Sequence, residues 1–233
     1  MLVFLENKNG DDEKFSAVVK SATKSLEGFP NLRPSMETGF HSLLPFAYVV
    51  HSHSLYAGIL NCAQKGKEIA EKLFPEMLWI GYENPGWEVT VAIASSLKTL
   101  ALKNSSKPAQ IIFLKNHGLI VAADDANQAY ELHEMVTEKI QNFLKTPTFK
   151  LAEIQNFSTS FMRKNVLFPD QIVFGISEEF AKSEVAAHIF AAYAFILRSL
   201  GQVGLEPVFI DQENVDFVAN MESEKYRKEV AKK

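Results

Sequence analysis

The chain has 233 residues, of which 47% are apolar and 22% are charged, and its formal net charge at pH 7 is -4. It is long enough for one large or two small domains. Its acidic balance and scattered lysines argue against nucleic-acid binding, which needs a basic stripe. The longest apolar stretch, Val185 to Leu197, contains His188 and ends at Arg198, so it is too short for a membrane span. The single cysteine, Cys62, excludes an internal disulfide and indicates a reducing compartment, and we expect a cytoplasmic protein without membrane or nucleic-acid partners.

Predicted helices and strands are interspersed over the first 145 residues. In chain order, we predict helices over 11–27 and 37–44, a strand over 46–50, a helix over 55–62, a strand over 76–81, a helix over 87–102, strands over 110–114 and 119–123, and a helix that ends at Leu144. The connection between the last two strands is short, which indicates an antiparallel pair. Asp124 or Asp125 is expected to cap the helix that follows.

A second domain is predicted to begin after Lys145, which divides the chain into residues 1–145 and 146–233. We interpret 146–165 as an irregular linker or arm, 168–175 as a strand, 185–200 as an apolar helix, 206–211 as a closing strand and 222–233 as a solvated helix. These elements are too few to bury a core alone. We therefore expect them to pack on the first domain or on a neighbouring subunit.

Two histidines, His51 and His53, follow the predicted strand over 46–50. Side chains two residues apart on an extended chain point to one side, so both imidazoles can face a single point. Neutral imidazole is the commonest protein ligand of zinc and related ions. His117, which precedes Gly118 at the end of another apolar strand, is the best candidate for a third ligand. Taken alone, the pair also fits two ordinary hydrogen-bonded histidines that bind no metal.

Several residues around this pair allow more than one role. Glu37 and His41 lie four residues apart on one helical face, so His41 is either a further contact of the metal site or a histidine packed against the strand. Tyr82, in a turn, is either accessible or fills a loop. We interpret His133, within a predicted helix, as structural and Cys62 as a small buried apolar side chain.

Four sequence motifs carry a resemblance to a known family. They are Pro34-Ser-Met-Glu-Thr-Gly-Phe-His41, His51-Ser-His-Ser-Leu-Tyr-Ala57, the Tyr82 of Gly-Tyr-Glu-Asn-Pro-Gly, and Leu114-Lys-Asn-His-Gly-Leu-Ile120. In order and rough spacing they resemble the class II aldolase/adducin family, from about residue 33 to residue 145. The resemblance implies a three-layer αβα fold, an α/β fold in which helices flank a central, mainly antiparallel sheet.

The resemblance also implies a set of site residues. The family's metal ligands correspond to His51, His53 and His117, with zinc as the expected ion. Glu37 corresponds to the family's acid/base and occasional fourth ligand, and Tyr82 to the proton donor of its sugar-phosphate aldolases. The neighbouring motif residues Ser35, Asn116 and Gly118 are expected to bind substrate.

The sequence departs from the family pattern in ways that bear on the substrate. Family members usually carry further residues ahead of this sequence, including a loop that holds the substrate phosphate, so we expect an N-terminally shortened chain. Met36 stands where the family's sugar-phosphate aldolases tend to have a second serine, which leaves phosphate recognition weak or absent. Residues 167–174 and 220–228 resemble the branch of rhamnulose-1-phosphate aldolase/dehydrogenase fusions, and we expect only the aldolase half here.

Two classes of function remain. The first is a metal-dependent aldolase-type lyase that cleaves or forms a carbon–carbon bond in a sugar or sugar phosphate, with an ion on three histidines stabilising an enediolate and Glu37 moving the proton. The alternative is a non-catalytic adducin-like interaction module or an inactive truncated aldolase homologue. The three histidines and the glutamate favour the first. The resemblance further implies a homo-oligomer, with a tetramer favoured, whose sites lie at subunit boundaries.

Overall fold

The structure is a computed structural model, and it describes residues 11–24, 33–102, 108–151, 159–175 and 183–231. Its centre is a four-stranded sheet in the order β1-β4-β3-β2. The strands are β1 (Tyr48–Ser52), β2 (Leu78–Ile80), β3 (Ile111–Leu114) and β4 (Gly118–Ala123). β4 pairs antiparallel with both β1 and β3, whereas β2 and β3 are parallel. The mainly antiparallel sheet and the antiparallel β3–β4 pair are therefore confirmed.

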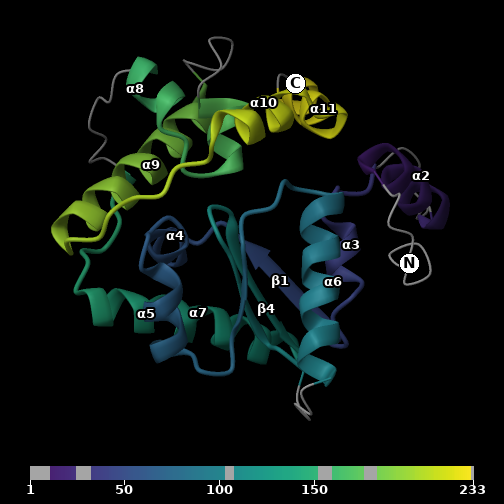
Figure 1. The fold of residues 1–233 in the computed structure, drawn as a ribbon, viewed down its shortest axis with the longest axis horizontal. Helices are drawn as coiled ribbons and strands as arrows, with labels where there is room; N and C mark the ends of the chain where they lie inside the picture. Colours follow the sequence, from purple (N-terminus) through teal and green to yellow (C-terminus); the bar gives the residue numbers. More distant parts are fainter. Residues whose placement is uncertain (1–10, 25–32, 103–107, 152–158, 176–182, 232–233) are drawn as a thin grey trace.

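Helices cover both faces of this sheet because its central strands are buried on both sides. Alternate residues of a strand point to opposite faces. Ile112, Leu114, Ile120 and Ala122 face one layer, and Ile111, Phe113, Leu119 and Val121 face the other. The first layer contains α3 (Thr38–His41) and α6 (Trp87–Leu102), and the second contains α4 (Leu55–Asn61), α5 (Gly66–Leu73) and α7 (Ala126–Leu144). Figure 1 shows these two groups of helices on opposite sides of the sheet, which confirms the three-layer arrangement.

Local capping sets several helix boundaries. α2 (Asp12–Ala22) begins after Asp11, whose carboxylate accepts from the Lys14 N–H, and it ends before Thr23, whereas the prediction ran over 11–27, of which 25–27 lie outside the described residues. α6 spans the predicted residues. α7 begins after Asp125, whose carboxylate accepts from the N–H groups of Asn127 and Gln128 at 2.9 and 3.1 Å, so Asp125 is the capping residue. The helix ends as predicted, where Lys145 adopts a left-handed conformation with φ 54°.

The first strand differs from its prediction in position and burial. β1 covers Tyr48–Ser52 instead of 46–50, and it lies at the edge of the sheet, paired only with β4. The apolar run over 46–50 favours a buried strand, but Tyr48 and Val50 are 47% and 36% exposed, so this expectation is wrong. Within the described ranges, no strand pairs with its other edge. The two-residue shift brings His51 into the ladder, opposite Ile120.

The C-terminal part of the chain is mainly helical and packs on the sheet-containing part. Its elements are α8 (Thr159–Lys164), the π-helix η2 (Gln171–Gly175), α9 (Glu184–Gln202), α10 (Gln212–Asn220) and α11 (Glu222–Ala231). Tyr193 and Ile196 of α9 pack against Ile59 of α4, which confirms the expected docking on the first part of the chain. Figure 1 shows this segment, green to yellow, arching over the end of the sheet to which the β1 arrow points.

The strand predicted over 168–175 is wrong, because residues Gln171–Gly175 form η2. The buried Gln171 side chain connects this element to the backbone of the preceding segment. Its Oε1 accepts from the Leu167 N–H at 2.9 Å, and its Nε2 donates to the Met162 carbonyl at 2.9 Å. A short buried apolar run does not distinguish a strand from a helix by its periodicity.

The closing strand predicted over 206–211 is also wrong. The segment forms only an isolated bridge between Ala63 and Pro207, and proline has no N–H to extend a ladder. The predicted helix over 222–233 is confirmed as α11 from Glu222 to Ala231, with 232–233 outside the described residues, but it is not fully solvated. Glu224 is 1% exposed and pairs with Arg227 at 3.0 Å. The arm predicted over 146–165 contains α8, and α5 and α10 lie outside the predicted helices.

α9 is the one helix in the described ranges that is long and apolar enough to cross a membrane by length and composition. In the structure, 44% of it is buried. Its buried residues Tyr193, Ile196 and Leu200 join a cluster with Ile59 of α4 and with Leu167. These contacts are those of a helix packed within a folded core.

Candidate metal centre

Four side chains from separate elements meet at the end of the sheet. They are Glu37, His51, His53 and His117, whose potential ligand atoms all lie within 4.8 Å of one another. Glu37 directly precedes α3, His51 lies in β1, His53 follows β1, and His117 lies in the connection between β3 and β4. The structure thus brings together the three histidines and the glutamate that the sequence motifs single out.

Strand pairing explains why these side chains converge. The antiparallel pairing of β1 with β4 places Ser52 opposite Leu119, so the chain around His51 and His53 runs beside Gly118. His117 reaches the same point because Asn116 turns the chain with φ 52°, a left-handed conformation that asparagine tolerates. The rings of the three histidines lie 5.1–5.2 Å apart, centroid to centroid.

The hydrogen bonds in this group leave ring nitrogens available as metal ligands. His51 Nδ1 lies 3.2 Å from the Leu119 carbonyl, to which it donates, so its Nε2 keeps a lone pair. That Nε2 is buried, lies 3.4 Å from Glu37 Oε1 and has no hydrogen-bond partner among the described residues. His117 Nε2 lies 3.2 Å from the same oxygen, and its buried Nδ1 has no hydrogen-bond partner in the described part of the chain.

The electrostatics favour a neutral His117 beside an ionised Glu37. Burial lowers the pKa of His117 to about 4, so its imidazole is neutral at pH 7. Burial opposes ionisation of Glu37, but the neighbouring His117 and His51 outweigh it and hold the pKa of the carboxyl below its usual range. Neutral imidazoles and a carboxylate are the donors that zinc uses in proteins. The buried, unpartnered Nε2 of His51 is the kind of atom that a bound cation would satisfy, so these residues fit a divalent metal.

A fifth residue contacts this group and was not singled out by its sequence. Asp170, just before η2, accepts a hydrogen bond from His53 Nδ1 at 2.7 Å. Burial acts against a charged His53, but Asp170 outweighs it and raises the pKa of the imidazole. Asp170 in turn pairs with Arg227 of α11 at 2.8 Å. The sequence signal is weak, since a single Asp after Pro169 carries no spacing that points to a histidine 117 residues earlier.

The three residues expected to bind substrate lie beside the centre in different settings. Ser35 lines the large cavity at the centre, and its Oγ accepts from the Glu37 N–H at 3.1 Å. Gly118 leaves room for the imidazoles. The side-chain amide of Asn116 donates to the carbonyls of Leu167 and Val208 at 2.9 and 2.7 Å. These two hydrogen bonds connect the turn to the C-terminal part of the chain. Their roles toward substrate stay predictions.

Tyr82 does not belong to the group of four. Its hydroxyl donates to Asn84 Oδ1 at 3.3 Å, and its ring packs in a cluster with Met36 and Val215 of α10. The side chain is partly buried, and this burial raises the pKa of the phenol. Its expected role as proton donor stays a prediction.

The remaining candidates occupy structural positions. His41 stacks on Phe40 with ring centroids 4.9 Å apart, which supports the packed alternative. His133 Nε2 lies 2.7 Å from Ser52 Oγ and links α7 to β1, as a structural histidine does. Cys62 is 1% exposed, which confirms a buried side chain.

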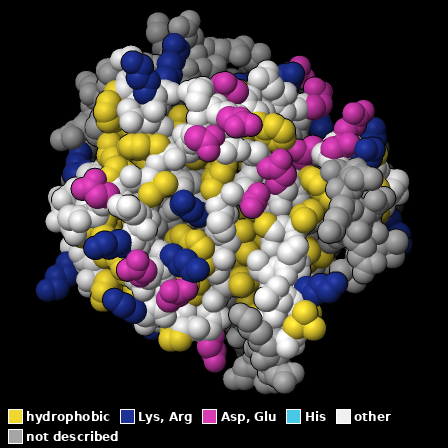
Figure 2. Space-filling model, viewed as in Figure 1, with side chains coloured by type: hydrophobic (Ala, Val, Ile, Leu, Met, Phe, Trp, Pro, Cys, Tyr) yellow, Lys and Arg dark blue, Asp and Glu magenta, His cyan; other side chains and the backbone are white. Residues whose placement is uncertain are grey.

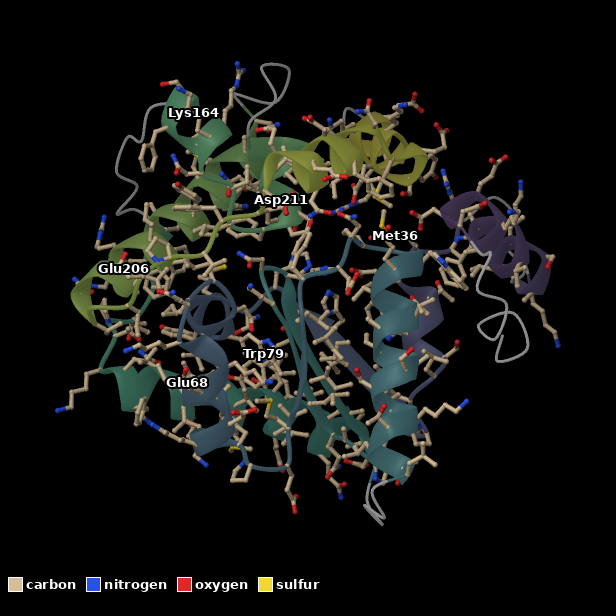
Figure 3. The ribbon with its side chains drawn as sticks, in the orientation of Figure 1. Met36, Glu68, Trp79, Lys164, Glu206 and Asp211 are labelled. Carbon is tan, nitrogen blue, oxygen red and sulfur yellow. The ribbon has the colours of Figure 1, made fainter. Side chains whose placement is uncertain are left out.

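Two cavities open onto the centre. The larger, of about 1180 Å³, reaches Glu37, His53, His117 and Asp170 and extends between α2, α10 and α11. The smaller, of about 280 Å³, reaches His53 and His117 from the side of α9, where Phe168, Ile189 and Ile196 make it apolar. Figure 3 shows Met36 below α10 and α11, and its Sδ lies 3.9 Å from Ser223 Oγ.

The fold and the site define a three-layer α/β domain with a histidine and glutamate group suited to a divalent metal. Residues 11–144 match the family model described as the Class II Aldolase and Adducin N-terminal domain. That match covers more than half of the chain, and the chain belongs to the class II aldolase/adducin family.

Two similar proteins extend this comparison. The uncharacterized oxidoreductase YuxG of Bacillus subtilis (strain 168) is 26% identical over 113 residues, which are 48% of this chain and 16% of that protein. The match therefore spans about a sixth of the length of that relative. The N-terminal class II aldolase domain of a conserved protein from Thermoplasma acidophilum is 26% identical, with a TM-score of 0.48, over 61% of this chain and 62% of that one.

Proposed function

We propose that this protein is a metal-dependent, zinc-type aldolase that cleaves or forms a carbon–carbon bond in a carbohydrate. The observation that carries the proposal is the convergence of Glu37 with three imidazoles, two of which have a buried nitrogen without a hydrogen-bond partner among the described residues. Catalysis also requires that the substrate can reach these residues. Glu37, His53 and His117 line a cavity of about 1180 Å³. A site of this volume accommodates a small sugar, since ligand pockets commonly measure about 300–1,000 Å³.

The residues divide the work as follows. His51, His53 and His117 would hold the ion, which when bound supplies positive charge that stabilises the oxyanion formed as the carbon–carbon bond breaks. Glu37 moves the proton on carbon. In the direction of bond formation its carboxylate accepts the proton from the carbon next to the carbonyl, and in the direction of cleavage it returns that proton. Its lowered pKa suits the accepting form at pH 7.

The second proton, on the aldehyde-side hydroxyl, is assigned to Tyr82 of a neighbouring subunit. Within its own subunit, the Tyr82 hydroxyl donates to Asn84 and the ring packs toward α10. We therefore assign Tyr82 to a site that it shares with a neighbouring subunit. This assignment makes the active protein a homo-oligomer, with a tetramer favoured. It rests on the family motif around Gly81 and Gly86 and on the raised pKa of the phenol, which keeps Tyr82 protonated as a donor.

We propose an unphosphorylated carbohydrate as the preferred substrate. The described lining of the large cavity holds two cations, Arg33 and Arg227, among a larger number of acids. Arg227 is already paired with Asp170 and Glu224, and Arg33 lies over the Tyr226 ring. Figure 2 shows acidic side chains gathered over α10 and toward α2, the elements that border this cavity. Such surroundings repel a phosphate, and Met36 offers it a thioether in place of a hydroxyl.

The competing function is an adducin-like interaction module without catalysis. The discriminating experiment measures bound metal by elemental analysis and then assays carbon–carbon cleavage with a panel of ketoses and ketose 1-phosphates. Bound zinc with turnover of a panel member supports the aldolase. Bound zinc without turnover of any compound supports the inactive homologue, and protein that takes up no metal after zinc is supplied overturns the ligand assignment.

A further inference from the structure

His53 differs from the other two histidines in how its ring is held. His51 lies within the β1 ladder and donates to the Leu119 carbonyl, and the His117 side chain is 3% exposed. His53 follows the last residue of β1, and its side chain is 34% exposed. Backbone pairing and burial therefore orient His53 least, so its ring depends most on a side-chain partner.

Asp170 supplies that partner. Its Oδ2 lies 2.7 Å from His53 Nδ1, which fixes the N–H on Nδ1 and leaves the Nε2 lone pair for the centre. A carboxylate in this position sets the tautomer and ring orientation of a metal-binding histidine and makes its other nitrogen a better ligand. Asp170 comes from the segment beyond residue 144, outside the part of the chain that matches the family model.

Asp170 is itself held by the last helix. Arg227 of α11 donates from Nη2 to Asp170 Oδ1 at 2.8 Å, so the two carboxylate oxygens serve different partners. The same guanidinium contacts Glu224 at 3.0 and 3.1 Å and lies 5.3 Å over the ring of Phe174. Glu224 is 1% exposed and the Asp170 side chain 15%, whereas the Arg227 side chain is 40% exposed, so the two carboxylates of this network are shielded from solvent and the guanidinium is only partly shielded.

From this geometry we propose that Asp170 is a positioning residue of the metal centre and that Arg227 holds it in place. The C-terminal segment thereby completes the site: a chain of contacts runs from α11 through Arg227 and Asp170 to His53. The inference rests on the proposed metal function but not on the aldolase reaction, because it concerns the affinity and geometry of the metal and makes no use of turnover.

The experiment compares metal affinity among full-length variants by competition with a chromophoric zinc chelator. Asp170→Ala removes the partner of His53 and is expected to weaken zinc binding by roughly 10- to 100-fold, the usual effect of losing such a partner. Asp170→Asn, which keeps the size of the side chain but loses its charge, is expected to have a smaller effect in the same direction. Arg227→Gln, which leaves Asp170 in place without its anchor, is also expected to weaken binding. Asp124→Asn, an exposed aspartate beyond the far end of β4, is the matched control and should bind zinc as the wild type does.

A second readout separates positioning from a general loss of stability. Cobalt(II) in place of zinc reports the ligand geometry through its visible absorption, which the Asp170 and Arg227 variants should change and Asp124→Asn should not. Equal zinc affinity and an unchanged cobalt spectrum in Asp170→Ala would overturn the inference while leaving the proposed function intact. Tight zinc binding without aldolase activity in the wild type, with weaker binding in Asp170→Ala, would leave the inference standing and overturn the proposed function.

Discussion

Gly118 lies so close to His51 that a Cβ at position 118 would stand 2.8 Å from the His51 Cε1 atom. The same Cβ would stand 2.7 Å from the Ser52 carbonyl oxygen and 3.1 Å from His53 Cδ2. The Ser52 backbone belongs to the β1 ladder, so it cannot move without disturbing the pairing with β4. A glycine is therefore needed here for space, since any side chain would push on two imidazoles at once.

Replacing Gly118 with alanine is expected to weaken zinc binding and to lower the free energy of unfolding by about 1–3 kcal/mol, the typical cost of overpacking. Chelator competition and chemical denaturation measure the two effects. Gly81→Ala is the matched control, because a Cβ at Gly81 meets nothing within 4 Å. If Gly118→Ala matches Gly81→Ala in both measurements, the space argument is wrong.

The Cys62 thiol is predicted to be unreactive in the folded protein. Burial raises its pKa to about 12, and only the thiolate is nucleophilic. At pH 8 the thiol is therefore neutral as well as 1% exposed, and iodoacetamide should not label it. Mass spectrometry before and after unfolding in guanidinium gives the comparison, with full labelling expected only after unfolding. Rapid labelling of the folded protein would contradict the buried, neutral thiol.

Single replacement of His51, His53 or His117 by alanine is expected to abolish tight zinc binding, because each would supply one of the converging imidazoles. Metal content after dialysis against a weak chelator measures the loss. His41→Asn is the control, since His41 packs on Phe40 and lies outside the group of potential ligands. Full metal occupancy in any one of the three alanine variants would exclude that histidine as a ligand.

Short-range geometry made the three histidines candidates, and the family motifs favoured a shared site over ordinary hydrogen-bonded roles. His51 and His53 are two residues apart at a strand end, and His117 and Gly118 mark the turn of an antiparallel pair. Glu37 was recognised through a motif, since nothing in its spacing alone brings it to a centre 80 residues away along the chain. The main element order of the sheet-containing part followed from the same local patterns.

The C-terminal part was harder to predict because long-range contacts decide it. The apolar residues 172–174 suit either a strand or a buried helix, and in the folded chain they form η2, whose first residue, Gln171, bonds to the backbone of Leu167 and Met162. Asp170 and Arg227 lie 117 and 174 residues beyond His53 in sequence, and only the folded chain brings them to it. Glu224 is charged, which favours a solvated position, yet its pairing with Arg227 permits burial.

Assembly is predicted to be required for activity, because Tyr82 is assigned to the site of a neighbouring subunit. The open edge of β1, with Tyr48 and Val50 exposed, is one surface that a partner could cover. Light scattering should show an oligomer, and Tyr82→Phe should lose activity while it keeps its metal. Mixed oligomers of Tyr82→Phe with Glu37→Gln should regain part of the activity, because some sites then combine an intact Glu37 with an intact Tyr82. A fully active monomer would refute the shared site.

Glu37→Gln is predicted to separate metal binding from catalysis. The three imidazoles remain in this variant, so zinc should stay bound, while loss of the positioned acid/base should slow carbon–carbon cleavage by roughly 10²-fold or more. The same assay, run with wild-type protein, tests the substrate class. Little preference for ketose 1-phosphates over the unphosphorylated sugars is expected, since the two arginines of the cavity already have partners in Asp170, Glu224 and the Tyr226 ring. A strong preference for the phosphorylated compounds would overturn the proposed substrate class. Unchanged turnover in Glu37→Gln would show that Glu37 is not the acid/base of the reaction.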